Sequence, residues 1–149
     1  MLGACVFAAS AATGAPKAQA VPPGQETITF DQVPSIGESS HLMGRVSNLD
    51  PGTHRVAVFI YNSGWYNKPL WSSPATVISP DGTFDCNVVT NPNDVNATRI
   101  AAFVVNQEYD IPLLNGHGDI PADVYDHSKA LLEITRGSGT LSFTAVPSL

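Results

Sequence analysis

The sequence predicts an all-β protein, an antiparallel β-sandwich of about seven to eight short strands with at most one short helix. Runs of β-forming residues recur at intervals of about eight to twelve residues. The segments between these runs are rich in glycine and proline, which number 12 each among the 149 residues. Within residues 83–89, Phe84, Cys86 and Val88 alternate with polar residues, as in a strand with one buried face. These observations favour a sandwich over a helical fold.

The predicted sheet is centred on residues 54–61, an almost unbroken run of apolar side chains. Such a run is typical of a strand that is buried on both faces. Residues 62–64 interrupt it, and residues 65–71 follow with both tryptophans of the protein. Because Pro69 and Pro74 cannot donate a hydrogen bond to a neighbouring strand, we expect residues 65–71 to form an edge strand or a loop.

The other strands are predicted from β-branched and aromatic residues that lie between turn-forming ones. They are expected at residues 26–30, 41–48, 75–78, 83–89, 98–105, 130–135 and 140–145. In the second of these strands, Leu42 and Val46 are expected to point inward. Cys86 falls on the apolar face of its strand, which favours a buried, inert thiol over a nucleophile.

The connections are predicted from turn chemistry. Residues 50–53 and 79–82 each contain proline followed by glycine within two residues, a pattern typical of tight turns. Residues 91–94 are expected to form another turn, and residues 106–121 an irregular segment. Residues 121–127 are expected to form one or two helical turns with Pro121 at the first position.

The N-terminus differs in character from the rest of the chain. Residues 2–12 are apolar and small, and Ala18-Gln19-Ala20 has the form of a signal-peptidase site. We therefore expect residues 1–20 to be a signal peptide cleaved after Ala20, residues 21–25 a flexible leader, and residues 26–149 a single sandwich domain of a secreted protein. No basic residue precedes the apolar run, which leaves open whether Met1 is the true start. An anchored lipoprotein and a plain N-terminal tail are the alternatives.

Charge limits the classes of partner. The whole chain has a net charge of −6, and only 13% of its residues are charged. Without residues 1–20, which contain Lys17 and no acidic residue, the net charge is −7. This balance argues against binding to nucleic acid or to anionic membranes, both of which require clustered lysine and arginine. No apolar stretch of about 18 residues occurs beyond the N-terminal region, so no membrane span is expected there.

The aromatic segment carries the candidate binding residues: Trp65, Tyr66, Asn67, Lys68 and Trp71. Flat rings beside amide and amine groups suit carbohydrate, because the C–H face of a sugar packs on a ring while its hydroxyls take hydrogen bonds. The alternative is that one or both tryptophans are core residues, as is common in sandwiches.

Other chemistry has little support in the sequence. The four histidines lack the spacing of a metal site, and no serine lies in a nucleophile-elbow motif. Loop aspartates leave a structural Ca²⁺ as an alternative, although no EF-hand spacing supports it. We therefore expect no cofactor and no enzymatic activity.

Several segments resemble an immunoglobulin-like β-sandwich module of bacterial secreted proteins. The resemblance rests on residues 44–46, 56–61, 64–69, 81–84, 97–103 and 134–136. It implies an accessory domain, of the kind often found beside polysaccharide-active enzymes, that binds glycans or spaces other domains. It implies no particular functional residue.

Two functional hypotheses follow from these observations. In the first, the protein is a non-catalytic secreted module that binds a glycan through the aromatic segment. In the second, it is a structural or protein-interaction domain whose aromatic residues lie in the core or bind a secreted protein. Exposure of Trp65 and Trp71 distinguishes the two.

Overall fold

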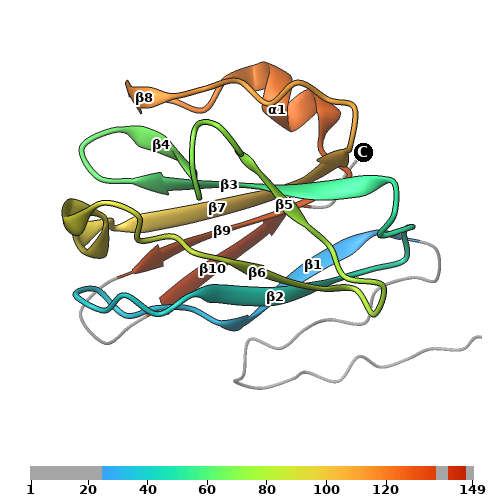
Figure 1. Ribbon diagram of the computed structural model, residues 1–149, viewed down its shortest axis with the longest axis horizontal. Coiled ribbons are helices and arrows are strands. Elements are labelled where there is room, and N and C mark those ends of the chain that lie inside the picture. Colours follow the sequence, from blue (N-terminus) through green and yellow to red (C-terminus); the bar gives the residue numbers. More distant parts are fainter. Residues whose placement is uncertain (1–24, 137–140, 147–149) are drawn as a thin grey trace, which may run out of the picture.

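The computed structural model describes residues 25–136 and 141–146, so the predicted signal peptide and most of the predicted leader lie outside the described residues. Two antiparallel sheets pack face to face (Figure 1). This arrangement confirms the predicted all-β sandwich. Within the described residues, no helix has the length and apolar character needed to cross a membrane.

The smaller sheet has the strand order β1-β2-β6. Its strands are β1 (Thr27–Gln32), β2 (Leu42–Ser47) and β6 (Thr83–Cys86). Along β2, buried and exposed residues alternate, and Leu42 and Val46 point inward as predicted. The sheet therefore has one face in the core and one in solvent.

The larger sheet has the strand order β10-β9-β7-β3-β4-β8. These strands are β10 (Leu141–Val146), β9 (Ala130–Arg136), β7 (Arg99–Asn106), β3 (His54–Tyr61), β4 (Trp65–Lys68) and β8 (Asn115–His117). β5 (Ala75–Val77) pairs with the first half of the β3 edge whose second half pairs with β4. The bounds of β3 match the prediction, and β3 is a central strand.

The larger sheet is buried on both faces, because the smaller sheet covers one face and a second layer of the chain covers the other. Val56, Val58 and Ile60 of β3 face the smaller sheet and form an inner core with it. Ala57 and Phe59 face the other way, into an outer core. The outer core is closed by α1 (Ala122–His127) and by the segment around β8, which lie above the larger sheet in Figure 1. This second cover explains the unbroken apolar run in β3.

Two connections differ from the sequence predictions. The predicted turn at residues 91–94 is a 3₁₀-helix, η1 (Pro92–Asn96). The predicted irregular segment of residues 106–121 contains β8, which pairs with β4. As a result β4 is a paired strand with a neighbour on each side, and only residues 69–71 of the predicted edge strand or loop are outside it. The predicted helical turns are present, with Pro121 as the residue before the helix.

Candidate functional site

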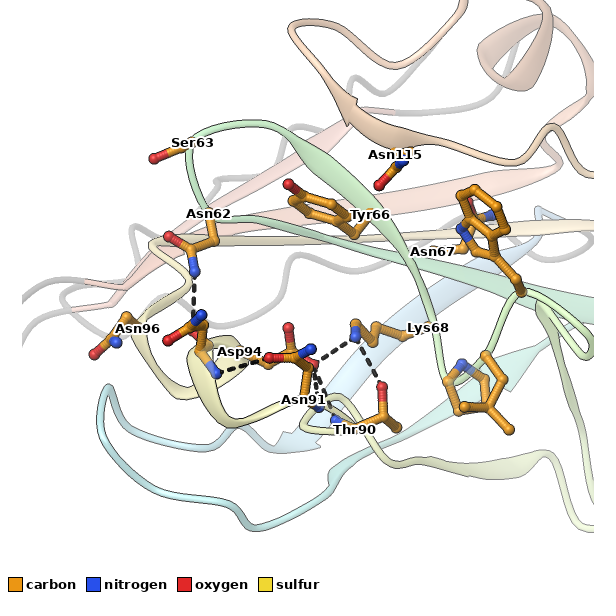
Figure 2. A pocket seen from close by; sticks show the side chains of 14 residues that line it. Asn62, Ser63, Tyr66, Asn67, Lys68, Thr90, Asn91, Asp94, Asn96 and Asn115 are labelled. Carbon is orange, nitrogen blue, oxygen red and sulfur yellow. Dashed lines mark hydrogen bonds and ion pairs between the residues drawn. The ribbon is translucent and has the colours of Figure 1, made fainter.

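A groove of about 660 Å³ lies between β4 and the segment of residues 90–96, which follows β6 (Figure 2). Its volume is within the range of about 300–1,000 Å³ that is usual for small-molecule sites. The lining residues are Asn62, Ser63, Tyr66, Asn67, Lys68, Pro69, Leu70, Trp71, Thr90, Asn91, Asn93, Asp94, Asn96 and Asn115. Six of these are asparagines, so the surface of the groove is dominated by uncharged amides.

The alternation of β4 provides the first wall. Successive side chains of a strand point to opposite faces of the sheet. Trp65 packs in the outer core, whereas Tyr66 packs beside the inner core on the opposite face. Lys68 shares the face of Tyr66 and points toward η1 (Figure 2). One short strand thus divides the aromatic segment between two different environments.

The 3₁₀-helix η1 forms the second wall, and a capping box fixes its start. The Asn91 side chain accepts a hydrogen bond from the backbone N–H of Asn93 at 3.1 Å. The Asp94 carboxylate accepts one from the backbone N–H of Asn91 at 2.8 Å. Both interactions satisfy backbone donors that have no partner within the helix. The same Asp94 oxygen also accepts from the backbone N–H of Thr90 at 2.9 Å.

A buried ion pair joins the two walls at the floor of the groove. Lys68 Nζ donates to Asp94 Oδ2 at 2.5 Å and to Thr90 Oγ1 at 2.9 Å. The two charged side chains are only 7% and 10% exposed. Burial of this kind requires a partner for each charge, and here each charge neutralises the other.

The turn between β3 and β4 is tied to η1 and to β8. The Asn62 side chain donates to the backbone carbonyl of Asn93 at 2.9 Å. Gly64 has φ +151° and lies so close to the backbone of Gly116 that a Cβ atom would collide with it. Gly116 in turn lies beside the Tyr66 ring, whose hydroxyl would be 3.1 Å from a Cβ atom at that position. The two glycines therefore allow β8 to pack against β4 and the Tyr66 ring.

Trp71 and Asn67 hold the segment that precedes β8. The indole N–H of Trp71 donates to the backbone carbonyl of Leu114 at 3.2 Å. The Asn67 amide donates to the carbonyl of Pro112 at 2.9 Å and accepts from the N–H of Leu114 at 2.5 Å. Trp71 is nevertheless 50% exposed, so its ring is oriented by a hydrogen bond while much of its surface remains accessible.

The five residues singled out in the sequence thus have different surroundings. Tyr66 and Trp71 line the groove, and Lys68 lies at its floor. Asn67 is buried and its amide is occupied by the neighbouring segment. Trp65 is 3% exposed, so the three aromatic rings do not form one continuous platform.

Trp65 belongs to a separate aromatic cluster. Its ring packs edge-on against Tyr61, with centroids 5.3 Å apart. The Arg99 guanidinium lies 4.4 Å from the Tyr61 ring centroid and 4.8 Å from the Trp65 ring centroid, which is the range of a cation–π interaction. Trp65 is therefore a core residue.

The second wall was not expected from the sequence. Asn91, Asn93 and Asn96 lie twenty or more residues from the aromatic segment, and only the fold brings them to it. In the sequence, this wall could have been recognised by composition, because residues 91–96 are rich in asparagine. The side-chain amides of Asn96 and Asn115 make no hydrogen bond within the described part of the chain and are exposed at the groove.

The chain was compared with protein-family models, curated proteins and solved structures, and none of them matches it. Among residues 25–136, no three His, Cys, Asp or Glu side chains are grouped as metal ligands would be. The chemistry of the groove therefore has to be inferred from its own residues: two accessible rings, uncharged amides and one internal ion pair.

Proposed function

We propose that the protein is a secreted, non-catalytic β-sandwich module whose groove binds carbohydrate. The observation that carries this proposal is that the Tyr66 ring lies beside a wall of asparagine amides (Figure 2), and that the half-exposed Trp71 lines the same groove. Aromatic rings suit the C–H faces of sugars. An amide both donates and accepts hydrogen bonds, as a sugar hydroxyl does.

A non-catalytic role is supported by the state of the charged groups in the groove. General acid–base chemistry requires a titratable side chain that can reach the substrate. Asp94 and Lys68 are the charged residues that line the groove, and they are engaged with each other and with the backbone and hydroxyl of neighbouring residues. These interactions suit a structural role for the pair.

The proposal can be tested by affinity electrophoresis in gels that contain soluble polysaccharides. We expect the protein to be retarded by at least one of them, and Tyr66→Ala and Trp71→Ala to weaken that retardation by about tenfold, equivalent to ~1.4 kcal/mol. Tyr125→Ala is a matched control, because Tyr125 is a 42% exposed aromatic residue on α1, outside the groove. Equal retardation of all four proteins would contradict the proposal.

A second function, protein interaction, is favoured by a different observation. Leu70 and Trp71 are both about half exposed, and Leu113, which adjoins the Leu114 carbonyl bonded by Trp71, is 47% exposed. Exposed apolar side chains that gather at one place are typical of contact surfaces. Leu113→Ser would weaken such a contact, whereas it should leave glycan retardation unchanged because Leu113 does not line the groove.

A further inference from the structure

We infer that the groove selects uncharged polysaccharides over acidic ones, an inference that rests on the proposed function. Among the described residues that line the groove, Lys68 is the one cation and Asp94 the one anion. They are bonded to each other at the floor. The groove therefore offers an acidic sugar no cation that is free to pair with it.

The structure keeps Lys68 from exchanging Asp94 for a ligand carboxylate. Asp94 is held by the backbone N–H groups of Thr90 and Asn91 as well as by Lys68. It cannot move away without breaking its hydrogen bonds to these two partly buried donors, which costs free energy. A ligand carboxylate that approached Lys68 would therefore meet the fixed negative charge of Asp94.

The remaining polar groups of the groove favour hydroxyls over carboxylates. Asn96 and Asn115 have exposed amides with no hydrogen bond inside the described chain, and each amide has both a donor and an acceptor end. A sugar hydroxyl can satisfy both ends. An ionised carboxylate only accepts, so it offers no donor to the acceptor end of an amide.

The charge of the whole chain acts in the same direction. A net charge of −6 creates a field that lowers the local concentration of anionic polymers.

The groove is also longer than the space that one sugar ring beside Tyr66 would occupy. Tyr66 lies near its middle and Asn62 and Asn96 lie near one end, in the view of Figure 2. Trp71 also lines the groove. The ligand class that fits is a segment of a neutral polysaccharide.

The experiment compares polysaccharides of the same backbone that differ in charge. Suitable pairs are hydroxyethyl cellulose with carboxymethyl cellulose, and methyl-esterified with unesterified polygalacturonate. Retardation of the protein is measured for each polymer at low and at high sodium chloride. We expect the neutral member of a bound pair to retard the protein at least about fivefold more strongly, with no dependence on salt, because no ion pair is formed.

Equal or stronger retardation by the acidic member would overturn the inference and leave the proposed carbohydrate function standing. Absence of retardation by every neutral and acidic polymer tested would overturn the proposed function as well. The two failures are therefore distinguishable in one set of gels.

A charge substitution at the groove gives an independent test. Asn96→Lys adds a free cation at an exposed lining position, and we expect it to increase retardation by the acidic polymers by about two- to fivefold in a salt-dependent way. Ser47→Lys is the matched control, since Ser47 is exposed at the end of β2 and does not line the groove. An equal gain in the two variants would mean that net charge, and not the groove, sets the preference.

Discussion

Lys68 Nζ donates to Asp94 Oδ2 at 2.5 Å, and this contact joins β4 of the larger sheet to the 3₁₀-helix that follows the smaller sheet. The two residues are 26 positions apart in the sequence. Because both side chains are almost fully buried, the pair holds the two walls of the groove together from below. Its removal should affect stability and groove geometry at the same time.

Breaking this pair is expected to destabilise the protein strongly. Lys68→Met leaves the Asp94 charge with its two backbone donors, and we expect it to lower the free energy of unfolding by about 3 kcal/mol. Asp94→Ala leaves a buried lysine and two unpaired backbone N–H groups, so its cost should be larger, about 4–5 kcal/mol. Urea denaturation followed by circular dichroism measures both values.

Arg45→Met provides the comparison for an exposed pair. Arg45 and Asp31 are 3.1 Å apart, with side chains that are 60% and 47% exposed. Loss of this ion pair in Arg45→Met should lower the free energy of unfolding by less than about 1 kcal/mol. A similar cost for Arg45→Met and Lys68→Met would show that burial does not strengthen the Lys68–Asp94 interaction.

Arg136 is expected to be a second residue of high importance for stability. It is 3% exposed, and its guanidinium donates to the carbonyl of Ala97 through two nitrogens and to the carbonyl of Pro34 at 2.7 Å. Lysine cannot reproduce this fork of donors. Arg136→Lys should therefore lower the free energy of unfolding by about 2–4 kcal/mol. Unchanged thermal and urea midpoints would contradict the structural role of the fork.

Cys86 should make stability depend on alkaline pH. Burial raises the pKa of its thiol from 9.0 to about 11. Between these two values the unfolded chain loses the thiol proton and the folded chain keeps it, so the free energy of unfolding falls as pH rises. The thiol should account for a loss of about 2 kcal/mol by pH 11.

Cys86→Ala should remove this contribution and flatten the pH profile between about pH 9 and 11. Tyr109, whose pKa is raised by burial and by its hydrogen bond to Asp123, also makes stability depend on alkaline pH, but it is present in both proteins and its contribution cancels in the comparison. Parallel profiles for the two proteins would show that the thiol is not protected from ionisation. The buried thiol predicted from the strand alternation is confirmed in the structure.

Most of the fold was predictable because hydrophobic patterning is local. The bounds of β3 follow from one apolar run, and the inward positions of β2 follow from alternation. β8 was not predictable in this way, since Asn115-Gly116-His117 has little β propensity and becomes a strand through its pairing with β4. Tertiary contact, and not local preference, determines that element.

The candidate site was predictable only in part. Period-two alternation already implies that Trp65 and Tyr66 point to opposite faces if residues 65–68 form a strand. A loop at residues 65–71, the alternative to an edge strand, would impose no such alternation. The burial of Lys68 was not foreseeable from composition, because lysine is almost never buried without a partner, and Asp94 reaches it only through the fold.

The most direct test of the account uses single-tryptophan variants. In Trp65→Phe the emission comes from Trp71 alone, and in Trp71→Phe it comes from Trp65 alone. We expect acrylamide to quench Trp71 efficiently and a bound neutral polysaccharide to protect it, because Trp71 is 50% exposed at the groove. Trp65, at 3% exposure, should be poorly quenched and unaffected by the polysaccharide. Quenching of Trp71 that no polysaccharide reduces would contradict the assignment of the groove as a carbohydrate site.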